Sequence, residues 1–142
     1  MSETDEIFQI VRKYWKILLK WILRIHDYPE ITVDELYELF NSDKPPLMID
    51  IRTVEDYNGT GYSKYGHITN ALSIPILKLE SKLVELEEYK EKEVVTMCPG
   101  GGLSLAAVDI MREAGFKDVK SLKAGTDAWN KKGYPTTTHK NK

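Results

Sequence analysis

Apolar residues near the start of the chain recur with the period of an α-helix. From residue 7 to residue 25 they stand alternately four and three positions apart: Ile7, Val11, Tyr14, Leu18, Trp21 and Ile25. Basic residues recur every four positions on another face of the same segment: Arg12, Lys16, Lys20 and Arg24. This spacing predicts an amphipathic helix that Ser2 or Thr4 caps at its start and that ends before Pro29.

Three roles are open for this N-terminal helix. It can pack on its own domain, form a homodimer contact, or lie as a basic amphipathic helix on an anionic membrane surface. A transmembrane span is excluded, because the segment contains five Lys and Arg residues and each costs roughly 2.5–3.5 kcal/mol at the centre of a membrane. The small-residue cleavage site of a signal peptide is also missing, so we expect a soluble protein.

From residue 29 onward, short apolar runs alternate with helical patterns. Runs that suit buried strands cover 46–51, 71–75, 93–97 and 116–122, and a brief strand precedes Thr32. Helices are predicted after Thr32, with Glu35 completing a capping box, and over 77–90, 103–115 and 125–133. This order predicts an α/β fold with a mostly parallel central sheet and helices on both faces.

The domain organisation is simple, because the chain has no repeat, no low-complexity tract and no Gly/Ser linker. We expect an N-terminal helix over 1–28, one domain over 29–136 and a C-terminal tail over 137–142.

The composition excludes several classes of function. Acidic and basic residues nearly balance at a net charge of −2, so no basic surface argues for nucleic acid. A single cysteine forms no internal disulfide, which makes a reducing, cytoplasmic setting the default. Three scattered histidines give no metal-ligand spacing.

The candidate chemistry lies in the stretch CPGGGLS, residues 98–104. Cys98 directly follows the predicted strand 93–97, so it should stand at the carboxyl edge of the sheet, where open α/β sheets bind ligands. Gly100, Gly101 and Gly102 let successive backbone N–H groups turn inward, and the helix from about Ser104 adds the positive end of its dipole. Such a loop favours an anion at its centre and the thiolate form of Cys98. A small buried structural cysteine is the simpler alternative.

Four segments, taken in order, resemble the single-domain rhodaneses, sulfurtransferases that carry sulfane sulfur as a cysteine persulfide. MIDIRTVEDY resembles the family's strand ending in Asp-x-Arg, and GHITNALSIP resembles its Gly-His-Ile segment that ends in Ile-Pro. CPGGGLS resembles its Cys-x-x-Gly-x-x-Ser/Thr loop, and AGTDAWNKKGYP resembles its Gly-Gly-x-x-Ala-Trp ending with Gly-Tyr-Pro. The matching part runs from about residue 31 to residue 135. The resemblance implies a rhodanese-like fold and a reaction that needs no cofactor or metal.

The resemblance also implies a role for each residue of the loop. Cys98 would be the nucleophile that takes sulfur from thiosulfate, a persulfide or a polysulfide and passes it to cyanide or a thiol. The N–H groups from Gly100 to Ser104 would stabilise the outer sulfur, whereas Pro99 has no N–H to offer. Leu103 stands where many family members have Arg, which favours a neutral or protein-bound persulfide donor over thiosulfate.

Two other functions stay open. A non-enzymatic rhodanese-like module could carry sulfur, or bind a partner protein through the N-terminal helix. Leu103, in place of the basic residue of many family members, is compatible with this alternative. A phosphatase of the related fold is more remote. Such phosphatases need a loop that closes with Arg to grip a phosphoryl group, and Ser104 stands at that position here.

Residues outside the loop are expected to support or border it. We interpret Asp50 and Arg52 as a structural pair at a strand end and His67 as a structural hydrogen-bonding residue. The segment 58–66 is longer than the usual link in the family, so it forms either a rim beside Cys98 or an ordinary surface insertion. As a rim it would bring four side chains to the donor: Tyr62, Ser63, Lys64 and Tyr65.

Overall fold

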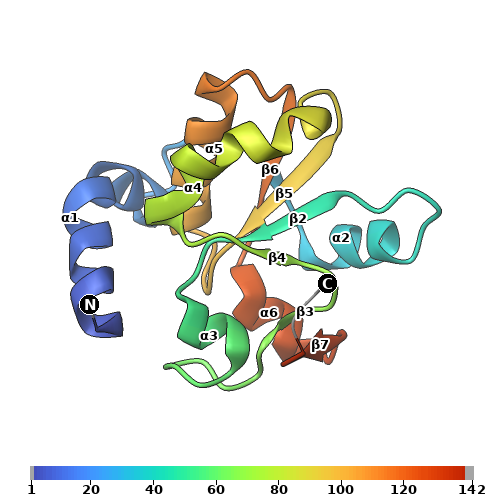
Figure 1. The fold of residues 1–142 in the computed structure, drawn as a ribbon, viewed down its shortest axis with the longest axis horizontal. Coiled ribbons are helices and arrows are strands. Elements are labelled where there is room, and N and C mark those ends of the chain that lie inside the picture. The colour runs from blue at the N-terminus through green and yellow to red at the C-terminus, as the bar shows by residue number, and fades with distance from the viewer. Residues whose placement is uncertain (1, 140–142) are drawn as a thin grey trace.

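The computed structural model of the chain describes residues 2–139. Its central sheet has five parallel strands in the order β1-β6-β5-β2-β4 (Figure 1). The strands are β1 Glu30–Ile31, β2 Leu47–Asp50, β4 Leu72–Ser73, β5 Glu93–Met97 and β6 Asp118–Leu122. The prediction of a mostly parallel central sheet is confirmed.

Helices cover both faces of this sheet. On one face lie α4 Ile76–Lys82 and α5 Leu103–Glu113, with α1 Glu3–Ile22 packed against the outside of α5 (Figure 1). On the other face lie α2 Val33–Phe40, α3 Val54–Asn58 and α6 Gly125–Lys131. Thr32 and Glu35 make both bonds of the predicted capping box at the start of α2. The α/β class follows from this layering.

Neighbouring residues of the central strands serve two separate cores. Ile49 and Val94 belong to the core under α4 and α5, whereas Met48 and Val95 belong to the core under α2 and α6. All four are at most 3% exposed. Because successive side chains of a strand point to opposite faces, a strand covered on both sides is apolar at most successive positions. This is why the sequence shows continuous apolar runs there.

Some local elements differ from the prediction. The expected helix over 77–90 divides into α4 and a 3₁₀ helix, Leu83–Tyr89, with non-helical dihedral angles at Leu86. Leu83 and Leu86 are both buried and stand three residues apart, which fits the three-residue period of a 3₁₀ helix. A two-stranded antiparallel sheet of β3 His67–Ile68 and β7 Thr136–Thr137 was not predicted, because two-residue strands are too short to show periodicity.

α1 packs on its own domain, but not through the whole of the predicted face. Ile10, Tyr14 and Ile17 contact the core, whereas Ile7 and Val11 of the predicted stripe are exposed. The prediction was wrong at these positions because apolar residues occupy most of the circumference of α1, so their period does not single out one face. None of the described helices is long and apolar enough to cross a membrane.

Carboxylates crowd together where the start of α1 meets α3. Thr53 donates a 2.7 Å hydrogen bond from Oγ1 to Oε2 of Glu3, and burial together with repulsion by Asp56 raises the pKa of Glu3. Glu6 has a buried Oε2 atom without a hydrogen-bond partner among the described residues. Burial, followed by repulsion from Glu55, raises the pKa of Glu6 as well. The ionised carboxylates therefore oppose the docking of α1.

This crowding predicts that α1 docks more firmly at acidic pH. A carboxyl whose pKa is raised by folding stabilises the fold below its ordinary value of 4.5, and the effect is lost as pH rises through the raised value. Glu6→Gln removes the buried charge, so its melting temperature should exceed that of the wild type at pH 7.5. The gain should shrink towards pH 4. Glu88→Gln, at an exposed glutamate, should change little, and a lower melting temperature of Glu6→Gln at pH 7.5 would contradict the prediction.

Candidate active site at the Cys98 loop

The thiol of Cys98 lies at the centre of the loop that joins β5 to α5. β5 ends at Met97, so Cys98 stands at the carboxyl edge of the sheet, and its side chain is buried with 1% exposure. Two backbone donors face its Sγ, the N–H of Gly101 at 3.1 Å and the N–H of Ser104 at 3.3 Å, and the Ser104 hydroxyl, which can donate or accept, lies 3.4 Å from it. A thiolate can accept all three hydrogen bonds, so the loop suits an anionic sulfur.

Ser104 is held in place by the strands beneath the loop. Its Oγ lies 2.6 Å from Oγ of Ser121 on β6, and Thr96 on β5 donates to the Ser104 carbonyl oxygen at 2.9 Å. Ser121 Oγ also lies 3.4 Å from the carbonyl oxygen of Gly101, to which it can donate. All of these hydroxyl groups are buried. The sequence analysis missed Ser121, because only strand pairing brings it under the loop.

The carbonyl groups of the loop point towards the first turn of α6. The N–H of Thr126 donates to the Cys98 carbonyl at 2.9 Å, and the N–H of Asp127 donates to the Pro99 carbonyl at 3.1 Å. Gly125 has φ = +69°, and a Cβ atom there would overlap both carbonyl oxygens. Only glycine permits this approach. These bonds fix the backbone at Cys98 and Pro99, and the Gly101 and Ser104 N–H groups that face the sulfur follow in the same loop.

A Cβ atom on each of the three loop glycines would meet a different obstacle. On Gly100 and Gly102 the nearest side chain would be Trp21 of α1. Gly101 has φ = +96°, and a Cβ atom there would lie 2.8 Å from the backbone nitrogen of Ala124. A Cβ atom on Gly102 would overlap the Trp21 ring, whereas one on Gly100 would meet that ring at an ordinary 3.5 Å. Trp21 therefore covers the loop. The sequence gives no local sign of this, because about 80 residues separate the two segments.

Leu103 faces a mostly apolar cavity between the loop and α1. The cavity has a volume of about 230 Å³, and Pro99 and Leu103 line it together with Ile7, Val11 and Leu18 of α1. Three polar residues beyond the end of β2 also border it: Arg52, Thr53 and Asp56. An arginine at position 103 would place a second cation in the same lining as Arg52. Leu103 thus contacts the same cavity as the apolar side chains of the helix that covers the loop.

A second cavity, of about 520 Å³, borders the loop at Gly100. Trp21 and two cationic residues, Arg24 and Lys123, contribute to its lining. Asp27 and Glu30 add negative charge to the same walls. This cavity therefore offers polar contacts of both signs next to the loop.

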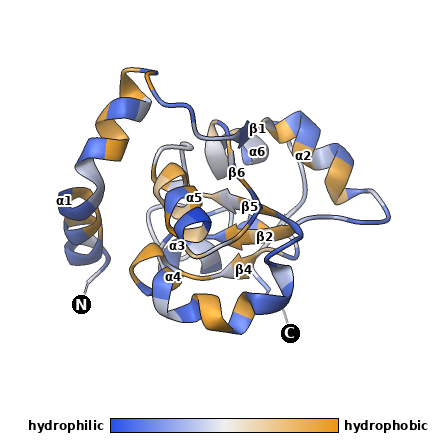
Figure 2. Ribbon diagram, turned by 90° about the horizontal axis from the view of Figure 1, so that it is seen from above, coloured by the Kyte–Doolittle hydropathy of each residue, from blue (hydrophilic) through white to orange (hydrophobic). Residues whose placement is uncertain are grey.

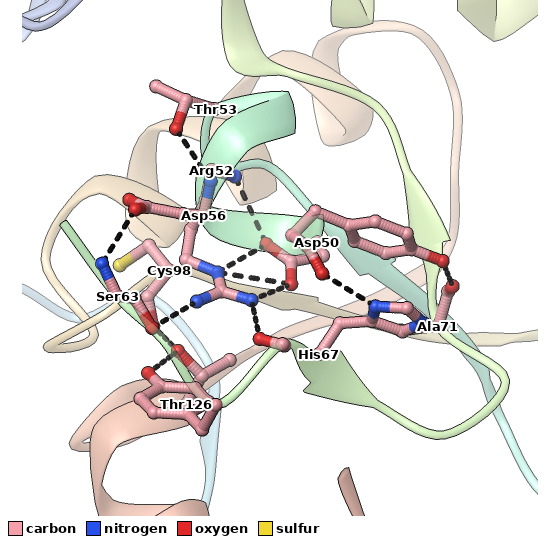
Figure 3. A network of polar contacts seen from close by, with 12 residues as sticks. Asp50, Arg52, Thr53, Asp56, Ser63, His67, Ala71, Cys98 and Thr126 are labelled. Carbon is pink, nitrogen blue, oxygen red and sulfur yellow. Dashed lines mark hydrogen bonds and ion pairs between the residues drawn. The ribbon is translucent and has the colours of Figure 1, made fainter. Parts of the chain in front are cut away.

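Asp50 and Arg52 form a buried ion pair at the end of β2 (Figure 3). Arg52 Nε and Nη2 donate to the two carboxylate oxygens of Asp50 at 2.9 and 2.7 Å, and Nη2 also donates to the Gly66 carbonyl at 2.7 Å. Burial lowers the pKa of the Arg52 guanidinium, but the hydrogen bonds and the charge of Asp50 outweigh burial, so the pKa is raised. Nη1 of Arg52 reaches Ser63 Oγ at 3.3 Å, which ties the segment 58–66 to the strand end.

The expected rim residues lie in different surroundings. The Tyr65 hydroxyl contacts Oγ1 of Thr126 at 2.8 Å and donates to Asp127 at the start of α6, and burial, then Asp127, raises its pKa to about 12. The Tyr62 hydroxyl instead contacts Oγ1 of Thr4 on α1 at 2.7 Å, and the side chain of Lys64 is exposed. Tyr65 thus borders the loop through Thr126, whereas Tyr62 joins the segment to α1.

His67 is fully buried beneath this region. Its Nδ1 lies 2.8 Å from the Tyr57 carbonyl oxygen, which can only accept, so Nδ1 carries the proton. Its ring stacks on the Tyr57 ring with centroids 3.5 Å apart. Within the described residues, no three His, Cys, Asp or Glu side chains gather into a group that could hold a metal ion.

Residues 32–132 match the family described as "Rhodanese-like domain". The chain belongs to the rhodanese-like family. A solved rhodanese-related protein from Thermoplasma volcanium has the same fold, with a TM-score of 0.66 and 27% identity, over 79% of this chain and all of that protein. The family match and this structure agree with the resemblance that the four sequence segments indicated.

Curated relatives of this rhodanese-like domain are named for sulfur chemistry. The putative sulfur carrier protein YrkF of Bacillus subtilis is 29% identical over 104 residues, covering 73% of this chain and 52% of that protein. The adenylyltransferase and sulfurtransferase MOCS3-1 of Zea mays is 31% identical over 106 residues, covering 71% of this chain and 21% of that protein. The chain thus spans about half of the first relative and a fifth of the second.

The glycine constraints predict opposite results for two neighbouring substitutions. Gly101→Ala forces alanine into a left-handed conformation against Ala124, so it should lower the free energy of unfolding by about 1–2 kcal/mol. Gly100→Ala is the matched control and should change it by less than about 0.5 kcal/mol. Urea unfolding curves measure both. Equal losses for the two variants would show that the loop backbone is not constrained as described.

The position of Trp21 predicts that this side chain limits access to the thiol. Trp21→Ala should increase the rate of Cys98 alkylation by iodoacetamide severalfold, because the ring no longer covers the loop. Trp15→Ala, on an exposed face of the same helix, is the matched control and should leave the rate unchanged. Intact mass measured over time gives both rates, and equal rates for Trp21→Ala and the wild type would contradict the prediction.

Proposed function

We propose that this rhodanese-like domain is a sulfurtransferase that carries sulfane sulfur as a persulfide on Cys98. The observation that carries the proposal is the convergence of the Gly101 N–H, the Ser104 N–H and the Ser104 hydroxyl on Sγ at 3.1–3.4 Å. A thiolate, which is the nucleophilic form of cysteine, can accept a hydrogen bond from each of these groups. They also lie close to the position that a second sulfur, bonded to Sγ, would occupy.

In the first half-reaction the Cys98 thiolate attacks the outer sulfur of a donor. The new bond joins Sγ to that sulfur, and the bond between the sulfur and the rest of the donor breaks. A persulfide donor R–S–S⁻ leaves as the thiolate R–S⁻, and thiosulfate leaves as sulfite. No proton transfer is needed, because the nucleophile enters and the leaving group departs as anions.

In the second half-reaction an acceptor nucleophile attacks the outer sulfur of the Cys98 persulfide. Cyanide becomes thiocyanate, and a thiolate becomes a persulfide, while Cys98 returns to its thiolate form. The loop donors hold the negative sulfur in both the resting and the loaded states. The cycle is a double displacement with a covalent intermediate.

We further propose that the donor is a persulfide, either small or on a protein, rather than thiosulfate. Support comes from Leu103, which lines a mostly apolar cavity whose cationic residue, Arg52, is already paired with Asp50. Arg24 and Lys123 supply cationic contacts only in the separate cavity at Gly100, where Asp27 and Glu30 oppose them. The phosphatase alternative lacks support for the same reason, because residues 98–104 contain no Arg or Lys.

The remaining candidates are proposed as supports of the loop. The Asp50–Arg52 pair fixes the end of β2 beside β5, and Tyr65 contacts Thr126, whose N–H holds the Cys98 carbonyl. None of these groups contacts Sγ, so we assign them positioning roles. His67, buried against Tyr57, belongs to the same structural group.

A sulfur carrier that does not turn over is the second candidate. The observation in its favour is the 1% exposure of Cys98 in a loop that Trp21 covers at Gly100 and Gly102, which restricts the access of an acceptor to the sulfur. A partner protein that displaced Trp21 would then be needed for transfer. The two candidates share the persulfide and differ in the second half-reaction.

The proposal predicts a measurable gain of one sulfur atom. After incubation with polysulfide, the intact mass should rise by about 32 Da, and a thiol reductant should reverse the gain. Cys98→Ser should abolish it, and the Gly100→Ala control should retain it. If neither polysulfide nor thiosulfate loads Cys98, the proposed function is wrong.

The loaded protein then separates the two candidates. A sulfurtransferase should lose the added sulfur when cyanide is supplied and should form thiocyanate over many turnovers. A carrier should keep its sulfur under the same conditions. Polysulfide should load Cys98 faster than thiosulfate if the apolar surroundings of Leu103 select the donor.

A further inference from the structure

α1 has an apolar face that the domain does not cover. We call it the outer face, and four large residues form it: Phe8, Trp15, Leu19 and Ile22. Phe8 and Ile22 are each 65% exposed and Trp15 is 51% exposed. Figure 2 shows hydrophobic and hydrophilic residues along α1, which lies at the edge of the molecule. Large apolar side chains along 20 residues of helix form a continuous strip.

The outer face is separate from the face that holds α1 on the domain. Ile10, Tyr14 and Ile17 pack on the core, and Trp21 packs on the Cys98 loop. With 100° of rotation per residue, these side chains lie more than a quarter turn from Trp15 and Leu19. The packing of α1 on the domain therefore does not use the residues of the outer face.

Basic side chains border the outer face on the side away from the domain. Arg12, Lys16 and Lys20 follow one another at intervals of about one helical turn. The chain has 22 acidic residues, and none of them occurs from residue 7 to residue 26. Arg12 lies 5.3 Å above the Phe8 ring and Lys16 lies 5.8 Å from the Trp15 ring. The bases thus stand directly beside the exposed aromatic rings.

We propose that α1 docks on the surface of a lipid bilayer that contains anionic lipids. The outer face would enter the boundary between headgroups and acyl chains, and the adjacent Lys and Arg side chains would contact the anionic headgroups. Helices that lie in this interface combine Trp, Phe and Leu on one side with Lys and Arg on the other. The bases alone attract such a surface, and each contributes to affinity.

A second copy of the chain fits the outer face less well. Two α1 helices packed through it would bring their Arg and Lys rows together, with no acidic residue from 7 to 26 to pair with them. Like charges along a helix–helix contact are destabilising. An anionic bilayer satisfies both the apolar strip and the basic row.

Sedimentation of the full chain with vesicles tests the proposal. Vesicles of equimolar phosphatidylglycerol and phosphatidylcholine should bind the protein at least tenfold more tightly than vesicles of phosphatidylcholine alone. Lys16→Ala/Lys20→Ala should weaken binding roughly 25-fold, about fivefold for each lysine. Trp15→Ser/Leu19→Ser should weaken it by roughly tenfold or more. Salt at 1 M should reduce the binding of the wild type.

Matched controls are available elsewhere on the surface. Val84→Ser removes an exposed apolar residue, Lys117→Ala removes an exposed base, and both should bind vesicles as the wild type does. Circular dichroism verifies that each variant is folded. Sulfur loading of Cys98 in Trp15→Ser/Leu19→Ser should match the wild type, which keeps this test independent of the proposed function.

Three results would overturn the proposal. They are no binding to the anionic vesicles, equal binding to both kinds of vesicle, and unchanged binding by both double variants. Light scattering gives the solution mass in the absence of lipid. A dimer that Trp15→Ser/Leu19→Ser converts to a monomer would also overturn the proposal, because it would assign the outer face to a second copy.

Discussion

Two hydrogen bonds from the start of α6 hold the carbonyl groups of Cys98 and Pro99, and the geometry of the loop depends on them. These two bonds fix the backbone at Cys98 and Pro99, from which the loop continues to the N–H groups of Gly101 and Ser104 that face Sγ. Glycine at 125 is the condition for this contact, because any side chain would overlap the carbonyl oxygens. The loop geometry thus rests on backbone contacts between residues that stand 28 positions apart in the chain.

The N-terminal helix adds a second constraint on the same loop. Trp21 fills the space above Gly100 and Gly102, and Leu103 lines a cavity with the apolar side chains of α1. An apolar residue at 103 is consistent with this packing, because its side chain completes the apolar part of the cavity lining. Leu103 is therefore a position at which the loop and the docked helix meet.

The segment 58–66 joins these parts into one unit. Arg52 binds Asp50, the Gly66 carbonyl and Ser63, while Tyr65 contacts α6 and Tyr62 contacts α1. Breaking a buried ion pair by removing one partner costs roughly 3–5 kcal/mol in proteins. The Asp50–Arg52 pair has 1% or less of each side chain exposed, so it anchors the segment firmly at the strand end. The inserted residues act as connections between elements in addition to covering the surface.

The sequence by itself determined the α/β class, the parallel strands and the Cys98 loop, because apolar periods, caps and glycines are local features that packing reinforces. It did not determine which face of α1 meets the domain, since apolar residues surround most of that helix and only the shape of α5 and the loop selects Ile10, Tyr14 and Trp21. Nor did it locate Ser121 beneath the loop. That contact depends on strand order, which brings together residues distant in the chain and leaves no local pattern.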